Sequence, residues 1–205
     1  MQRVIFFDLG NVIVSVNKPL AIRAFAERTG IQPKTLAAAV HSKLEMDFEK
    51  GLLSDAEYLR RIHTVYPMSR TLTLRDMIEV WKLPFTKINA VCDLLPVLQQ
   101  QAKLCLLSNT NYVHFSAIRE KYAIDHWFDD LILSYEVGFR KPDPQIYQKA
   151  LMQTGTRAGR AIFIDDLAEN VRAAEDLGIR SHLFRNIAGL LKFLTESGYR
   201  IQNAT

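Results

Sequence analysis

Short apolar runs recur along the chain, and segments with helical periodicity separate most of them. The runs that predict strands are Val4–Phe7, Leu104–Leu107, Ala161–Ile164 and Ser181–Phe184, with Leu131–Leu133 as a weaker fifth. A strand made entirely of apolar residues is typical of a parallel sheet that is covered on both faces. The segments predicted as helices are Tyr112–Lys121, Pro144–Gln153, Ala168–Leu177 and Asn186–Glu196. This alternation predicts an α/β fold built on a parallel sheet.

The pattern changes between the first two predicted strands. From Asn17 to about Leu95 the apolar spacing predicts helices and no strand. The expected helices run from Asn17 to Gly30, from Pro33 to about Leu44, from Ser54 onward, where Ser54–Glu57 has the pattern of a capping box, and over Thr73–Lys82. Such a block is too long for an ordinary crossover. The predicted organisation is a three-layer Rossmann-like core, residues 1–15 and 90–205, with an inserted α-helical cap, residues 16–89.

Composition limits the function classes. The 205 residues are 48% hydrophobic and 23% charged, which is the balance of a soluble globular protein. The net charge of +4 is spread without a dense basic run, so a nucleic-acid partner is not expected. Two cysteines do not make a disulfide framework, and Cys105 is expected in the core. No signal-peptide pattern or long apolar segment is present, so we expect a cytoplasmic location and no membrane partner.

Polar residues follow the predicted strands where each one ends. Asp8 follows the first strand, Ser108 and Asn109 follow Leu104–Leu107, and Asp165 and Asp166 follow Ala161–Ile164. Each feature has an ordinary alternative, either a turn aspartate or a helix N-cap. Because parallel strands present their carboxyl ends at one edge of the sheet, these side chains are expected to meet there.

A lysine in a rigid loop completes the set. Lys141 precedes Pro142 in the segment GFRKPDP, although a solvated Lys-Pro turn would have the same sequence. Adjacent carboxylates such as Asp165 and Asp166 repel each other, and a Mg²⁺ ion with its preference for oxygen ligands would relieve that repulsion. A free carboxylate, anion-binding donors, a lysine and a metal site together favour phosphoryl transfer through an aspartyl-phosphate.

Four motifs in this order resemble those of the haloacid dehalogenase-like hydrolase superfamily. They are FFDLGN with Asp8, LSNTN with Ser108, GFRKPDPQIY with Lys141, and FIDDLAENVRAAEDLG with the acidic pair. The resemblance covers essentially the whole chain, and the helical block falls where the family places its cap. It implies a Rossmann-like core with a helical cap.

The resemblance also implies roles for the site residues. Asp8 would be the nucleophile and a ligand of Mg²⁺. Lys141 would bind the substrate, neutralise the developing charge and keep Asp8 ionised. Asp166 would bind Mg²⁺ directly, with Asp165 in or just behind the ligand set, and the backbone carbonyl of Gly10 would be another ligand.

Ser108 and Asn109 would hold the phosphoryl oxygens of the substrate. Within the superfamily, FDLGNVIV, LSNTN and GFRKP are similar to a bacterial subgroup that includes phosphatases of sugar phosphates such as glucose 1-phosphate. The implied activity is Mg²⁺-dependent hydrolysis of a small phosphorylated metabolite, sugar phosphates first, by a monomer or weak homodimer.

Gly10 departs from the family pattern. Most phosphatases of the family carry there a second aspartate that protonates the leaving group, and general acid–base help is worth about 10²–10⁴-fold in rate. Asn11, a residue of the cap, or water are possible stand-ins for this acid, and Asn11 is alternatively a turn residue. A metal-independent 2-haloacid dehalogenase and a low-activity or binding and regulatory protein of the same fold remain alternatives. The acidic pair favours Mg²⁺ and therefore phosphate.

Three further residues each have two interpretations. His114 follows the Ser108 loop and either faces the site or occupies an ordinary first-turn helix position. Phe48 and Trp81 in the cap either line the site or form the cap's own core, and the core is the favoured interpretation.

Overall fold

Five parallel strands form the central sheet of the protein. The computed structural model describes residues 2–39 and 42–201, and its sheet has the order β5-β4-β1-β6-β7. The strands are β1 Val4–Phe7, β4 Lys103–Ser108, β5 Asp130–Leu133, β6 Ala161–Asp165 and β7 Arg180–Leu183. Every neighbouring pair is parallel. The five predicted strands are therefore confirmed to within two residues at each end.

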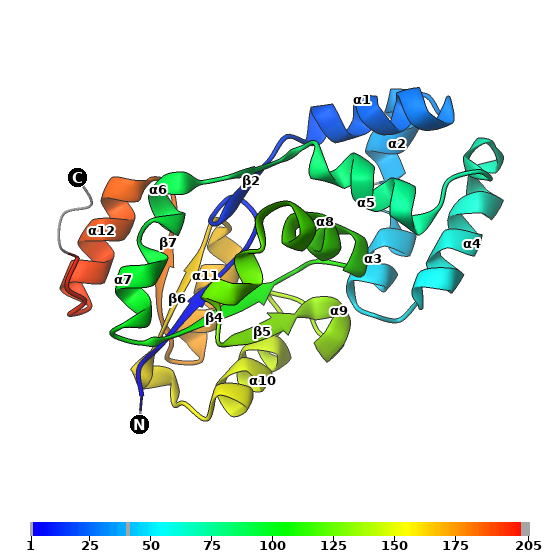
Figure 1. Cartoon of the computed structure of the whole chain (residues 1–205). Helices are drawn as coiled ribbons and strands as arrows, with labels where there is room; N and C mark the ends of the chain where they lie inside the picture. The colour runs from blue at the N-terminus through cyan, green and yellow to red at the C-terminus, as the bar shows by residue number, and fades with distance from the viewer. Residues whose placement is uncertain (1, 40–41, 202–205) are drawn as a thin grey trace.

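Helices cover both faces of this sheet (Figure 1). Alternate residues of β1 enter two separate hydrophobic clusters, with Ile5 and Phe7 in one and Val4 and Phe6 in the other. The first cluster includes residues of α7 Leu95–Gln99, α8 Tyr112–Tyr122 and α12 Ile187–Glu196. The second includes residues of α10 Pro144–Thr154 and α11 Ala168–Asp176. The predicted three-layer α/β core is confirmed.

Five helices gather to one side of the core, at the upper right of Figure 1. They are α1 Lys18–Thr29, α2 Pro33–Ala39, α3 Lys43–Glu49, α4 Asp55–Val65 and α5 Leu74–Lys82, with a 3-10 turn over Pro67–Ser69. The prediction of one helix from Pro33 to about Leu44 is wrong, because Ser42 is extended and its hydroxyl caps a new helix. Residues 40 and 41 of that prediction lie outside the described residues.

Helix caps explain where two of these helices begin. The Ser54 hydroxyl accepts a hydrogen bond from the Glu57 amide, as predicted, while the Glu57 carboxylate pairs with Arg60 and Arg61. The reciprocal capping box lies at α5, where Thr73 and Asp76 each accept from the other's backbone.

A two-stranded antiparallel ribbon joins this helical part to the core. It consists of β2 Val14–Val16 and β3 Phe85–Lys87, paired with Val16 opposite Phe85. The sequence predicted no strand between Asn17 and about Leu95, and β3 shows that this prediction is wrong. Each strand has three residues and becomes stable only when it pairs with the other, which local periodicity cannot reveal.

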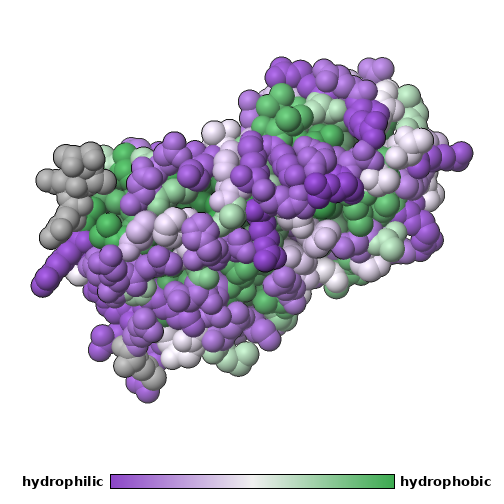
Figure 2. Space-filling view, viewed as in Figure 1, coloured by the Kyte–Doolittle hydropathy of each residue, from purple (hydrophilic) through white to green (hydrophobic). Residues whose placement is uncertain are grey.

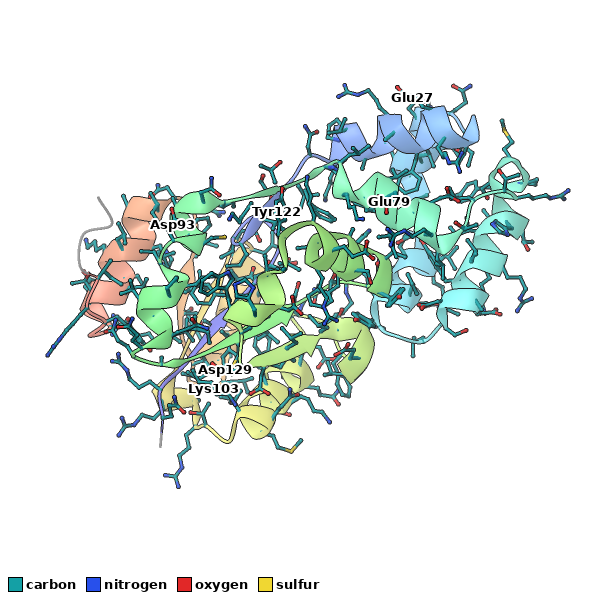
Figure 3. All side chains as sticks on the ribbon, viewed as in Figure 1. Glu27, Glu79, Asp93, Lys103, Tyr122 and Asp129 are labelled. Carbon is teal, nitrogen blue, oxygen red and sulfur yellow. The ribbon has the colours of Figure 1, made fainter. Side chains whose placement is uncertain are left out.

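Helix α8 of the core provides a second attachment. Tyr122, labelled in Figure 3, donates a hydrogen bond of 2.9 Å to the Phe85 carbonyl. Lys121 donates to the Lys82 and Phe85 carbonyls at 2.7 and 2.8 Å. The end of α5 and the start of β3 are thus tied to α8. The division into core residues 1–15 and 90–205 and cap residues 16–89 stays a prediction.

Two short helices complete the core, α6 Asn89–Cys92 after β3 and α9 Ser134–Val137 after β5.

The described part of the chain contains no helix with the length and apolarity needed to cross a membrane. Cys92 and Cys105 are both buried free thiols, and Cys105 lies within β4 as predicted.

Candidate active site

Strands β1, β4 and β6 bring the predicted site residues to one edge of the sheet. Phe7 of β1 pairs with Leu106 on one side and Ile164 on the other, so the three strands end at the same level. Asp8 continues β1 and its amide donates to the Ile164 carbonyl at 2.9 Å. Ser108 is the last residue of β4, and Asp165 is the last of β6.

Lys141 lies at the centre of this site. Its ammonium donates to Asp8 Oδ1 at 2.7 Å, to Asp165 Oδ2 at 2.6 Å and to the Leu107 carbonyl at 2.8 Å. Only 2% of Lys141 is exposed, and Asp165 is fully buried. All three donor positions of the ammonium are filled, so a buried charge is fully hydrogen-bonded.

Burial and charge act in opposite directions on these groups. Burial and, to a smaller extent, the charge of Asp165 raise the pKa of Asp8, while Lys141 lowers it. The net result is a pKa of about 6. Burial by itself would lower the pKa of Lys141, but the carboxylates of Asp8 and Asp165 outweigh it and the pKa is raised. Asp8 is therefore a desolvated carboxylate, weakly hydrated and available to react.

Three carboxylates form a set that fits a divalent cation. Asp8, Asp165 and Asp166 each place one oxygen within 4.8 Å of the others. Asp165 is oriented by the Leu167 amide at 2.8 Å and by the Asn170 amide group at 3.0 and 3.1 Å. Clustered carboxylate oxygens are the donor set that Mg²⁺ prefers.

Two asparagines in this site were not among the predicted site residues. Asn170 lies in the first turn of α11, five residues after Asp165 and within the fourth motif. Asn11 donates to Asp166 Oδ2 at 2.9 Å and has a left-handed backbone with φ 55°. Asn11 therefore shapes the turn, which is one of its two predicted roles, and also holds a carboxylate of the acidic cluster, whereas its role as a stand-in for the missing acid stays a prediction.

Asn109 connects two of the loops. Its side chain donates to the Lys141 carbonyl at 2.8 Å and accepts from the Lys141 amide at 2.7 Å. This double hydrogen bond fixes the loop that carries the lysine. Contact of Ser108 and Asn109 with phosphoryl oxygens stays a prediction, as does the metal contact of the Gly10 carbonyl.

A cavity of about 500 Å³ extends from this edge into the helical part. Gly10, Ser108 and Asn109 line it on the core side. Trp81 also lines it, whereas Phe48 is buried and stacks on Tyr58 at 3.8 Å between ring centroids. Phe48 therefore belongs to the core of the helical part, as the favoured interpretation has it, whereas Trp81 faces the cavity.

His114 fits both of the interpretations left open. It lies in the first turn of α8, where its amide donates to Asn111, and its ring lines the cavity beside Trp81. Burial, together with the charge of Lys18, lowers the pKa of His114 to about 3. The imidazole is thus neutral across the physiological range.

The turn between α3 and α4 touches the core beside the site. Arg140 and Glu49 form an ion pair of 3.0 Å across this contact. Gly51 has φ +66°, and a Cβ there would lie 2.0 Å from the Tyr135 carbonyl oxygen. Only glycine permits this approach of the two backbones.

Gly51→Ala is expected to separate this turn from the core, because backbone must shift to admit the methyl group. We expect KM for the substrate to rise about tenfold or more and the melting temperature to fall. Gly155→Ala is the matched control, since Gly155 has φ +63° but open space around its Cβ. It should cost only the left-handed strain of roughly 1–2 kcal/mol and leave KM unchanged. Equal KM values for the two variants would contradict the contact.

The family of the chain follows from this arrangement and from comparison with known proteins. Residues 2–178 match the model of the haloacid dehalogenase-like hydrolases, and the chain belongs to that family.

Curated relatives and a solved structure extend over nearly the whole chain. It is 26% identical over 203 residues to a D-ribitol-5-phosphate phosphatase from Bacteroides thetaiotaomicron, covering 95% of this chain and 98% of the relative. It is also 26% identical to the sesquiterpene phosphatase astK of Aspergillus oryzae, covering 89% and 90%. The crystal structure of the enzyme bt-2542 from Bacteroides thetaiotaomicron, in complex with magnesium and inorganic phosphate, matches with a TM-score of 0.77. That match has 25% identity over 89% of this chain and 93% of the other.

Proposed function

We propose that the protein is a Mg²⁺-dependent phosphomonoester hydrolase that works through an aspartyl-phosphate on Asp8. The observation that carries the proposal is the contact of one buried lysine with both Asp8 and Asp165, at 2.7 and 2.6 Å, beside a third carboxylate. The relatives named as phosphatases and the similar structure with magnesium and phosphate support it.

Asp8, Asp165 and Asp166 would hold the Mg²⁺ ion, which would neutralise charge on the phosphoryl oxygens. An Asp8 oxygen would attack phosphorus, and the bond from phosphorus to the ester oxygen would break. The ester oxygen would leave as an alkoxide and take a proton from water to become the alcohol. Lys141 offsets the negative charge that gathers around Asp8. Water then attacks the aspartyl-phosphate, releasing phosphate and restoring the carboxylate.

The two alternatives differ from this proposal in their need for metal. The acidic cluster has no function in a metal-independent dehalogenase, and a cluster of buried charges that binds nothing is costly in free energy.

Residues 16–89 are proposed as the cap that closes over the site. The buried free thiols support a reducing, cytoplasmic compartment, and a monomer or weak homodimer stays a prediction.

Removal of metal is the direct test of the proposed function. Phosphate release from phosphomonoesters should stop after treatment with a chelator and return when Mg²⁺ is added in excess. A dehalogenase would release halide from 2-chloropropionate in the presence of chelator, and a binding protein would show neither activity. Chelator-resistant phosphate release would contradict the proposal.

Gly10→Asp tests whether this site merely lacks the usual acid. A Cβ on Gly10 meets no atom within 4 Å, so the side chain has space. We expect kcat to rise by up to about 10²-fold for esters with a poor leaving group, because the new carboxyl supplies general acid help. The rate with p-nitrophenyl phosphate should change little, since that leaving group needs no proton.

Gly10→Asn is the matched control, because it has nearly the same shape and no acid. It should leave the rates near wild type or below. A comparable loss of activity in both variants would show that the site requires glycine.

A further inference from the structure

The cavity beside Asp8 has mainly apolar walls, although charged residues such as Lys18, Glu45 and Arg140 also line it. Its apolar lining includes Ile22 and Phe25 of α1, Ile62 of α4, Met77 and Trp81 of α5, and Phe85 of β3. In Figure 2, green hydrophobic surface is visible among the polar residues over this part of the molecule. A volume of about 500 Å³ is in the range that encloses a drug-sized ligand.

The two acidic side chains on the cavity wall already have partners within the protein. Glu45 accepts a hydrogen bond from the Tyr58 hydroxyl, and Glu49 pairs with Arg140. Burial raises the pKa of Glu45 to about 7, so this acid is largely uncharged in mildly acidic solution and only partly charged at neutral pH. His114 is neutral.

These walls disfavour a substrate rich in hydroxyl groups. A hydroxyl group buried without a hydrogen-bond partner lowers affinity on the order of tenfold. A polyol would bring several such groups into contact with Ile22, Phe25 and Met77. A methylene group at the same place gains affinity by leaving water.

The cavity reaches the residues that adjoin the reacting groups. Leu9 and Gly10 line it on one side of Asp8, and Ser108 and Asn109 line it from the neighbouring strand. A phosphate held at Asp8 would therefore point its alcohol toward the cap. We propose that this alcohol is a bulky apolar one, an alkyl or isoprenoid chain. This inference rests on the proposed phosphatase function.

A matched pair of substrates tests the inference. Pentyl phosphate and ribitol 5-phosphate share a five-carbon skeleton and differ only in hydroxyl groups. With Mg²⁺ present, we expect kcat/KM to be about tenfold or more higher for pentyl phosphate. In the series from ethyl to decyl phosphate, kcat/KM should rise about fourfold for each methylene until the cavity is filled. A flat series, or a preference for ribitol 5-phosphate, would overturn the inference and leave the phosphatase function intact.

Two variants of helix α1 test whether the preference for long alkyl chains arises in the cavity. Ile22 lines the cavity, whereas Leu20 is not among the lining residues. Ile22→Asn should lower the ratio of decyl to ethyl phosphate kcat/KM about tenfold, and Leu20→Asn should leave that ratio as in the wild type. The same loss of ratio in both variants would show that the preference does not arise in this cavity.

Binding of phosphonates separates this inference from the proposed function. Phosphonates are not hydrolysed, so calorimetry with decylphosphonate and methylphosphonate measures the affinity of the site for each compound without turnover. Decylphosphonate should bind at least about 10²-fold more tightly in the presence of Mg²⁺. Equal affinities would overturn the inference. Tight decylphosphonate binding with no Asp8-dependent hydrolysis of any ester would instead reject the phosphatase function and keep the apolar site.

Discussion

Asp8→Asn is expected to lower kcat for phosphomonoester hydrolysis on the order of 10⁶-fold, the scale of loss when a covalent nucleophile is removed. The amide is a poor nucleophile and cannot form the acyl-phosphate bond on which the proposed reaction depends. Phosphate release measured over hours with a large excess of enzyme would detect the residual rate. The fold should persist, because asparagine has nearly the same volume and can still accept from Lys141.

The control for this variant is Asp176→Asn, which makes the same change on the exposed surface of α11. It should retain wild-type kcat. Thermal melts of both variants would show that they are folded. Turnover by Asp8→Asn within tenfold of the wild type would mean that another residue attacks phosphorus.

Lys141→Met is expected to lower the free energy of unfolding by about 3–5 kcal/mol at pH 8, the cost of removing one partner from a buried ion pair. Asp8 and Asp165 would then be buried together without the positive charge that lies 2.7 and 2.6 Å from them. Their repulsion raises the pKa of Asp8 further, so this carboxyl binds a proton more tightly in the folded than in the unfolded chain.

The sign of the pH dependence follows from that difference. The folded variant holds a proton that the unfolded chain releases, so its stability falls as pH rises from the unfolded value near 4 through the raised pKa of Asp8. The loss relative to wild type should be smaller at pH 5 than at pH 8, and urea unfolding at both values measures it. Excess Mg²⁺ should restore part of the stability, because the ion replaces the missing charge. An equal loss of stability at pH 5 and pH 8 would indicate that the variant is destabilised by poor packing and not by the missing charge.

Local sequence was sufficient for the sheet strands and for most of the site. Runs such as Val4–Phe7 are wholly apolar, and in a parallel sheet that pattern alone marks a strand buried on both faces. Motif residues follow those strands directly, so their meeting at one edge depends only on parallel pairing. That is why Asp8 and Asp165 could be placed together from the sequence, whereas Lys141 lies in a loop beyond β5 and α9 and required the motif order as well.

Contacts between distant residues were beyond the reach of the sequence. Asn11 and Asp166 are 155 positions apart, and Asn109 and Lys141 are 32 apart. Asparagine is common in turns and helix caps, so its residue type does not reveal a distant partner. The ribbon of β2 and β3 escaped prediction because each strand is short and is stabilised by the other.

The sequence by itself determined that Asp8, Ser108 and Asp165 each lie at the end of a strand, that Asp166 is next to Asp165, and that residue 10 is not an acid, since these are properties of local sequence. Only the tertiary structure decided what the apolar faces of helices α1 to α5 cover. Residues of these helices line one cavity beside the site. The apolar pattern of each helix taken singly had predicted only that the helices pack on one another. The physical reason is that helical periodicity identifies an apolar face but not the surface or the ligand that covers it.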